Sequence, residues 1–239
     1  MTLENLTLGY ERRPVLRGLD GVVPAGELLA LIGPNGGGKS TLLKALAGLL
    51  APLTGRISRG GLKAGEIAHL PQAAEIDRSF PIRVEEFVAL GALRRCGLFA
   101  RFDASEEARV ASALAAVGLT GSEARPLEAL SGGQMQRALF ARLVVEDRDV
   151  ILLDEPFGAI DAATTRDLLA LVARWHAEGR TVIAALHEFD IVRRAFPRAL
   201  LLSGEAIFWG DSQTALSPQN LELARRRAEF APEVRAHAL

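Results

Sequence analysis

The chain has 239 residues, a formal net charge of −1, an apolar fraction of 49% and a single cysteine, Cys96. That length is enough to bury a large core, so we expect one large domain or a core with a small insertion. The near-neutral charge argues against nucleic acid as the main partner, and one cysteine excludes an internal disulfide and favours a reducing compartment.

The chain begins with MTLENLTLGY, which carries an acid at Glu4 and no long apolar run, so it does not resemble a secretory signal. The longest stretch without charge, Val110 to Ser122, covers 13 residues and is rich in alanine and serine. A membrane-spanning helix needs about 20 mostly apolar residues. We therefore expect a soluble chain.

An apolar run from Leu28 to Ile32 predicts a buried strand, and the sequence GPNGGGKST follows it at residues 33–41. The next residues predict a helix from Lys39 to about Gly48. A strand, then G-x-x-x-x-G-K-S, then a helix is the pattern of a phosphate-binding loop. The glycines let backbone N–H groups wrap around phosphate, and the helix start adds partial positive charge.

This pattern assigns specific roles within the loop. We expect Lys39 to reach the β- and γ-phosphates of a nucleotide and the Ser40 hydroxyl to ligate Mg²⁺. The predicted phosphate-binding residues are Gly33, Pro34, Asn35, Gly36, Gly37, Gly38, Lys39, Ser40 and Thr41.

A partner acid for this loop is found in VILLDEP, Val150 to Pro156. The apolar residues predict a central strand, and its two carboxylates stand at the carboxyl end, the edge where open α/β sheets bind ligands. We expect Asp154 to hold Mg²⁺ through water and Glu155 to polarise the water that attacks the γ-phosphate. Alone, two acids after an apolar run would equally fit a solvated turn.

The segment LSGGQ, Leu130 to Gln134, precedes a second helical pattern, MQRALFARLVVED. Ser131 is a good N-cap, and two glycines open the backbone at the helix start, so this is a second helix N-terminus suited to an anion. An ordinary capped helix would give the same pattern, and the residues alone leave both readings open.

Together with the other two motifs, LSGGQ followed by Gln136 and Arg137 resembles the signature of ATP-binding cassette (ABC) ATPases, over about residues 3–221. The resemblance implies an α/β fold: a P-loop NTPase (RecA-like) core with an antiparallel β subdomain and a helical subdomain insertion. In that family two cassettes pack head to tail, so a second copy of the chain is an expected partner. The signature of one copy then closes over the ATP of the other, which assigns ATP contacts to Ser131, Gly132, Gly133 and Gln134.

Four further positions match the family one at a time. Tyr10 looks like the aromatic residue that stacks on adenine. Gln72, in HLPQ, resembles the glutamine that senses Mg²⁺ and the attacking water. Asp161 looks like the aspartate that couples the two sites across the dimer, and His187 like the histidine that contacts the γ-phosphate. The family usually has His-Asp where this chain has His187-Glu188, which keeps the acid.

The resemblance also divides the chain. We expect a single ABC ATPase domain, 1–239, in which 1–72 and 146–220 form the nucleotide-binding core, with antiparallel strands from the first part and parallel strands from the second. Residues 73–145 would form the helical subdomain with the signature, and 221–239 a C-terminal tail with a short helix. The interval between Gln72 and the signature is far too short for the coiled coils of chromosome-maintenance ATPases, so we expect no nucleic-acid partner.

The cargo is indicated by the residues after Gln72. Asp77, Phe80-Pro81-Ile82, Val84 and a helix ending in Gly91 resemble importers of zinc and manganese. The stretch LLLSGEAIFWGD, a predicted hairpin followed by a helix, also fits them. Iron-chelate and vitamin importers share much of this pattern. The resemblance implies an integral membrane permease and, indirectly, an extracytoplasmic solute-binding protein, with this chain peripheral on the cytoplasmic face of the inner membrane.

The histidines and the cysteine show no metal-ligand spacing, so cargo selectivity would reside in the partners, and Mg²⁺ with ATP is the only metal expected here. Among the alternatives, a soluble non-transport cassette protein usually carries two cassettes, and this chain has one. LSGGQ argues against a P-loop kinase or switch GTPase. An exporter subunit stays open, although the compact chain favours an importer.

Overall fold

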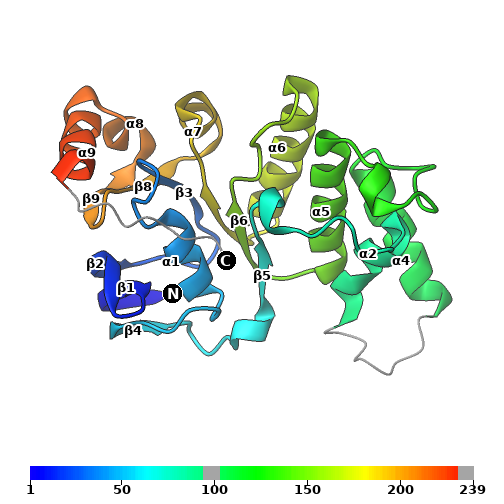
Figure 1. Ribbon diagram of the computed structural model, residues 1–239, viewed down its shortest axis with the longest axis horizontal. Helices are drawn as coiled ribbons and strands as arrows, with labels where there is room; N and C mark the ends of the chain where they lie inside the picture. Colours follow the sequence, from blue (N-terminus) through cyan, green and yellow to red (C-terminus); the bar gives the residue numbers. More distant parts are fainter. Residues whose placement is uncertain (94–102, 231–239) are drawn as a thin grey trace.

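A computed structural model gives the structure of the protein and describes residues 1–93 and 103–230 (Figure 1). Two sheets form its framework. The smaller one is antiparallel, with strand order β2–β1–β4. Its strands are β1 (Thr2–Tyr10), β2 (Arg13–Val22) and β4 (Thr54–Ser58).

The larger sheet has six strands in the order β5–β6–β7–β3–β8–β9, and all pairs are parallel except β8–β9. Its strands are β3 (Leu28–Ile32), β5 (Ile67–Leu70), β6 (Val150–Asp154), β7 (Thr181–Ala185), β8 (Arg198–Leu202) and β9 (Ala206–Asp211). Every residue of β3, β6 and β7 is buried, as expected for apolar parallel strands covered on both faces.

Alternation along β3 divides the core between the two faces of this sheet. Leu29 and Leu31 pack into one apolar cluster with the antiparallel sheet and helix α1 (Lys39–Leu46), which lies between the sheets. Leu28, Ala30 and Ile32 point to the other face. There they join a second cluster with α6 (Ala162–Ala177), α7 (Phe189–Ala195) and the helical region.

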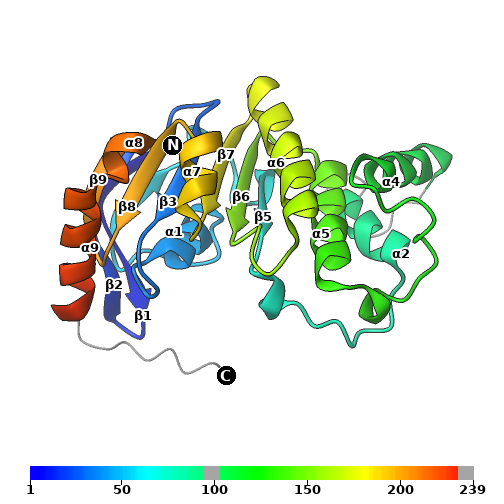
Figure 2. The same cartoon turned by 90° about the horizontal axis from the view of Figure 1, so that it is seen from above.

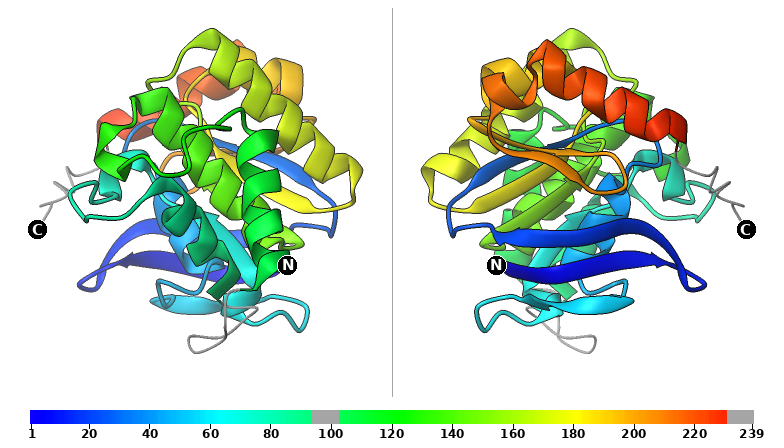
Figure 3. Two further views of the ribbon diagram at one scale, coloured as in Figure 1. Left: turned by 90° about the vertical axis from the view of Figure 1, so that its right-hand side faces the viewer. Right: turned by 90° about the vertical axis from the view of Figure 1, so that its left-hand side faces the viewer.

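The helical region occupies one end of the molecule (Figures 1 and 2). It contains α2 (Val84–Ala89), α4 (Ala104–Ala116) and α5 (Gly132–Glu146), and α5 contacts α2, α4, α6 and β5. The opposite end carries α8 (Ser212–Ala215) and α9 (Pro218–Phe230), and the right-hand view of Figure 3 shows α9 and the antiparallel sheet together at this end. Short 3-10 helices are η1 (Ala64–Glu66), η2 (Ala73–Glu75), η3 (Leu90–Ala92) and η4 (Leu127–Ala129).

The structure confirms the strand at Leu28–Ile32, the strand beginning at Val150 and the N-cap at Ser131. The helix after the phosphate-binding loop is two residues shorter than predicted, because it ends at Leu46 and Gly48 adopts a left-handed φ of 77°. The predicted division of strands was wrong in part. β3 and β5 come from the first segment yet join the parallel sheet, and β9 from the second segment is antiparallel.

The predicted tail helix is α9, which begins at Pro218, before the predicted boundary at 221. Cys96, His237 and residues 231–239 of the predicted tail lie outside the described residues. Across the part of the chain that the structure describes, none of the helices combines the length and apolarity needed to cross a bilayer.

Candidate functional site

The loop between β3 and α1 packs closely against the end of β8 and the turn between β8 and β9. Gly33 has a φ of 138°, and a Cβ on it would lie 1.9 Å from the Leu202 carbonyl oxygen. The Gly37 N–H donates to the Pro34 carbonyl at 3.1 Å, and the Gly37 carbonyl accepts from the Gly204 N–H at 3.2 Å. Close approach of two backbones therefore sets the shape of the loop.

Lys39, the first residue of α1, is 5% exposed. Its Nζ donates to the carbonyls of Gly33 at 2.8 Å and Pro34 at 3.0 Å. Burial lowers the pKa of this ammonium, while the negative charges of Glu155 and Asp154 oppose the shift. The loop thus holds the Lys39 ammonium against its own backbone carbonyls. An anionic ligand could replace these carbonyls as the acceptor of the ammonium's hydrogen bonds.

The start of α1 meets the end of β6 through Ser40 and Asp154. The Ser40 hydroxyl donates to Asp154 Oδ1 at 3.0 Å. Asp154 is 2% exposed, and burial raises the pKa of its carboxyl, an effect that the Ser40 hydrogen bond opposes and the charge of Glu155 increases. A hydroxyl and a desolvated carboxylate beside a phosphate-binding loop are hard oxygen donors, and this donor set fits Mg²⁺.

Glu155 is held from three sides. The Gln72 Nε2 donates to its Oε2 at 2.8 Å, and His187 Nε2 lies 2.5 Å from its Oε1. Its backbone adopts a left-handed φ of 48°, and its N–H donates to the Ala185 carbonyl at 3.1 Å. A non-glycine residue rarely adopts this φ, so local strain and two side-chain contacts aim the carboxylate.

These residues surround a cavity of about 510 Å³. It is lined by Val15, Asn35, Gly36, Gly37, Gly38, Lys39, Ser40, Thr41, Gln72, Glu155 and His187. The lining combines backbone N–H groups, an ammonium and hydroxyls from residues 35–41 with the amide of Gln72, the carboxylate of Glu155 and the imidazole of His187. Such a cavity can bind a polyphosphate and hold a water molecule against it.

Several predicted residues lie behind the lining rather than in it. The Gly33 and Pro34 carbonyls hold Lys39, and Asp154 contacts the cavity wall through Ser40. Tyr10, the last residue of β1, is 47% exposed and does not line the cavity.

The signature residues and Asp161 form a separate group. Ser131 caps α5, and its hydroxyl accepts from the Gln134 N–H at 3.2 Å, while the Ser131 N–H donates to Gln134 Oε1 at 3.1 Å. Asp161 caps α6 by accepting from the Thr164 N–H at 2.8 Å. A Cβ on Gly133 would lie 3.5 Å from Asp161 Oδ2, so the starts of α5 and α6 adjoin. Ser131, Gly132, Gly133, Gln134 and Asp161 do not line the cavity within one chain.

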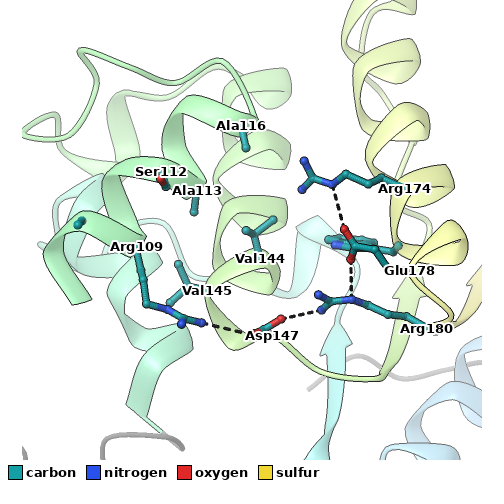
Figure 4. Close-up of a pocket in the computed structure, with 12 residues that line it drawn as sticks. Arg109, Ser112, Ala113, Ala116, Val144, Val145, Asp147, Arg174, Glu178 and Arg180 are labelled. Carbon is teal, nitrogen blue, oxygen red and sulfur yellow. Dashed lines mark hydrogen bonds and ion pairs between the residues drawn. The ribbon is translucent and has the colours of Figure 1, made fainter. Parts of the chain in front are cut away.

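A second cavity, of about 530 Å³, lies between α4, α5 and the C-terminal end of α6 (Figure 4). Its charged side chains pair in a row. The ion pairs are Arg109–Asp147 at 3.4 Å, Asp147–Arg180 at 2.9 Å, Arg180–Glu178 at 3.0 Å and Glu178–Arg174 at 3.6 Å. Because each of these charged groups already has an ion-pair partner and no predicted site residue lines this cavity, the cavity at the phosphate-binding loop is the stronger candidate.

Sequence reasoning missed two contributors to the site. Val15, on β2, lines the cavity, and the Leu202 carbonyl at the end of β8 supports the loop through Gly33. An apolar strand residue and a backbone carbonyl carry no motif, so only the arrangement of the strands reveals them.

The family model that matches this chain is described as ABC transporter, and it covers residues 16–158. The chain belongs to the ABC transporter family. It therefore has the P-loop NTPase fold of that family, binds ATP, and is an ATPase coupled to transport.

Relatives extend the similarity over nearly the whole chain. The zinc transport system ATP-binding protein TroB of Treponema pallidum is 35% identical over 99% of this chain and 94% of its own length. The manganese transport system ATP-binding protein MntB of Bacillus subtilis is 35% identical over 92% of this chain and 90% of its own.

Solved structures agree on the fold. A chain described as part of a metal-chelate type ABC transporter in an inward-facing conformation superposes with a TM-score of 0.83, 29% identity and coverage of 94% of this chain and 88% of that one. A bacterial ABC transporter cassette described as dimeric has a TM-score of 0.77, 25% identity and coverage of 88% of this chain and 98% of that one.

Proposed function

We propose that this chain is the ATP-hydrolysing subunit of an importer for a divalent metal ion, with zinc as the first cargo to test and manganese as the second. The observation that carries this proposal is the near full-length similarity to cassettes named for zinc transport and for manganese transport, at 35% identity in both cases. Equal identity favours neither metal, so the cargo depends on experiment.

The cavity supports a specific division of roles. Lys39 would exchange its contacts with Gly33 and Pro34 for contacts with β- and γ-phosphate oxygens. Backbone N–H groups of the loop would hold the remaining oxygens. Catalysis of phosphoryl transfer consists largely of such positioning and charge stabilisation.

Glu155 would orient the attacking water. Gln72 and His187 hold its two carboxylate oxygens, so the group is already aimed at the cavity before ATP binds. Ser40 and Asp154 would hold Mg²⁺, with Gln72 nearby, and the ion neutralises charge on the phosphate oxygens when bound. Tyr10 would stack on adenine from the exposed end of β1.

The second half of each site would come from a second copy of the chain. Ser131 and Gly133 lie at a helix N-terminus, which suits an anion, yet they do not reach the cavity of their own chain. A head-to-tail dimer would bring them, with Gln134 and Asp161, over the ATP of the partner.

The membrane partner would be an integral permease that docks on residues just after Gln72, placing the chain at the cytoplasmic face of the membrane. Large apolar side chains are exposed in this segment, namely Phe80 at 64%, Leu90 at 42% and Leu93 at 42%. Contiguous exposed apolar patches mark interaction surfaces, so these side chains are the candidates for the docking face. An extracytoplasmic solute-binding protein would deliver the metal to the permease.

Uptake of labelled zinc and manganese tests the proposal. Cells of the source organism that carry Glu155→Gln should lose uptake of one metal under metal starvation, and Glu229→Gln, an exposed carboxylate on α9, serves as the matched control. Loss of zinc uptake alone supports the zinc importer, and loss of manganese uptake alone replaces the cargo. Unchanged uptake of both metals contradicts metal import, and absence of the chain from purified membranes would favour a non-transport cassette.

A further inference from the structure

Lys44 links the phosphate-binding helix to the segment that carries Gln72. It stands on α1, four residues after Ser40 and therefore on the same helical face. Its Nζ donates to Glu75 Oε1 at 2.9 Å. Glu75 ends η2, which begins directly after Gln72, and the Glu75 N–H donates to the Gln72 carbonyl at 2.9 Å.

With this ion pair, the contacts around the site form a closed ring. Ser40 bonds to Asp154 at 3.0 Å, Glu155 follows Asp154 in the chain, and Gln72 bonds to Glu155 at 2.8 Å. The ion pair between Glu75 and Lys44 then leads back to the helix of Ser40. Neither Lys44 nor Glu75 lines the cavity.

The segment after β5 has few contacts with the sheet. Among the described residues, β5 is an edge strand of the six-stranded sheet that pairs with β6 alone, so the residues that follow it have a sheet neighbour on one side. Ala73 and Ile76 of this segment pack against the apolar core, and the ion pair adds a polar contact. Lys44 and Glu75 side chains are 30% and 44% exposed. An ion pair at that exposure contributes little to global stability, but it can restrict where a short segment lies.

The ion pair also favours the charged form of Lys44, because the hydrogen bond to Glu75 is the first cause of a raised pKa at Lys44. Loss of one partner would therefore leave the other charge unopposed near the site.

We propose that the Lys44–Glu75 ion pair is a positioning element that holds Gln72 against Glu155 and so tunes the hydrolysis step without contacting ATP. The inference rests on the proposed function, because it takes Gln72 and Glu155 to act in hydrolysis. The existence of the anchor is testable apart from that function.

The first test measures hydrogen–deuterium exchange of the nucleotide-free full chain. In Glu75→Gln and Lys44→Met, the amides of residues 73–76 should exchange at least about threefold faster, since the segment is released. Glu4→Gln is the matched control, because it removes the Arg56–Glu4 ion pair at 2.7 Å in the antiparallel sheet. Unchanged exchange at 73–76 in the two variants would overturn the anchor, whatever the ATPase does.

The second test separates kcat from KM for Mg-ATP. Each single variant should lower kcat about threefold to tenfold and leave KM within about twofold, while Lys44→Arg keeps kcat. The double variant should be no slower than the slower single variant, because both changes break one contact. A kcat equal to that of the wild-type chain in both single variants, or effects that multiply in the double variant, would reject the pair as a unit. If Glu155→Gln hydrolyses ATP at the wild-type rate, the proposed function would be rejected instead.

Discussion

Gly33 combines a backbone angle and a contact that no side chain tolerates. Its φ is 138°, and an added Cβ would overlap the Leu202 carbonyl oxygen at 1.9 Å. Gly36 separates these two effects, because its φ is 74° and an added Cβ would meet no atom within 4 Å. The pair therefore distinguishes the cost of backbone strain from the cost of displacing β8.

Gly33→Ala is expected to lower the free energy of unfolding of the nucleotide-free chain by about 2–4 kcal/mol, because overlap adds to strain. Gly36→Ala should cost only about 1 kcal/mol, the price of the left-handed angle. Urea unfolding of both variants checks this. Equal losses would show that contact with Leu202 contributes nothing.

The ionised carboxylate of Asp154 lowers the stability of the fold but is the form that the proposed Mg²⁺ site uses. Burial raises the pKa of its carboxyl in the folded state, so the ionised form disfavours folding at neutral pH. A group whose folded pKa is raised contributes stability at low pH and loses that contribution as pH rises through the folded pKa. Asp154→Asn keeps an oxygen that can accept from Ser40 and removes the charge.

Asp154→Asn should therefore raise the unfolding free energy of the nucleotide-free chain by up to about 1 kcal/mol at pH 7.5. The gain should shrink as the pH falls through the raised pKa of the wild-type carboxyl, which then becomes protonated. The same variant should lower Mg²⁺-dependent ATPase activity about 100-fold, since a neutral amide binds the ion poorly. Asp149→Asn, an exposed carboxylate just before β6, should change neither quantity. Denaturant melts across pH and ATPase assays provide the measurement, and a loss of stability at pH 7.5 would contradict the argument.

At the residue scale, local sequence predicted what backbone chemistry dictates and missed what tertiary contact supplies. The loop residues, Asp154 and Glu155 could be named because glycine, lysine and strand-end acids have narrow uses. Val15 could not be named, since the sequence does not show which of many possible neighbours a valine on a strand contacts. The bond from Gln72 to Glu155 likewise joins residues 83 positions apart.

Among the elements, α5 begins at a serine, Ser131, that has a structural role and a proposed binding role. Ser131 caps the helix through the Gln134 N–H, and the same helix start is the proposed anion site for the partner's ATP. Ser131→Ala removes the cap, and Ser131→Asp replaces one good cap with another while adding negative charge.

Ser131→Ala is expected to cost about 1 kcal/mol of stability. Ser131→Asp should keep wild-type stability, because an acid is favourable at a helix N-terminus, yet lower ATPase activity at least about tenfold by repelling phosphate. Thermal melts and ATPase rates together decide. Wild-type activity in Ser131→Asp would exclude an anion at this helix start.

Element existence was easier to predict than element order. The buried strands were readable because unbroken apolar runs of four or five residues suit a sheet covered on both faces. The order β5–β6–β7–β3–β8–β9 was not, since pairing partners such as β3 and β7 are separated by about 150 residues. The antiparallel β9 follows from a short turn after β8, a feature that the predicted hairpin had captured without its sheet.

For the whole molecule, the separation of the two groups of site residues has a consequence for assembly. The cavity is lined by the loop, Gln72, Glu155 and His187, whereas Ser131 and Asp161 do not line it. If two copies complete each other's sites, ATP contributes contacts to both chains and stabilises the dimer by mass action. Hydrolysis would remove those contacts, so the dimer of an active chain would be short-lived.

Glu155→Gln should keep ATP binding, because Glu155 is proposed to orient water rather than to hold phosphate, and should therefore accumulate a dimer in Mg-ATP. Sedimentation at micromolar chain concentration should show a species of twice the single-chain mass for this variant and mainly single chains for wild type. The combined Glu155→Gln/Ser131→Asp variant is the control, since its added charge at α5 should prevent closure and restore single chains. A dimer that forms equally without ATP, or that survives the Ser131 change, would mean that the two chains meet through some surface other than the cavity and the start of α5.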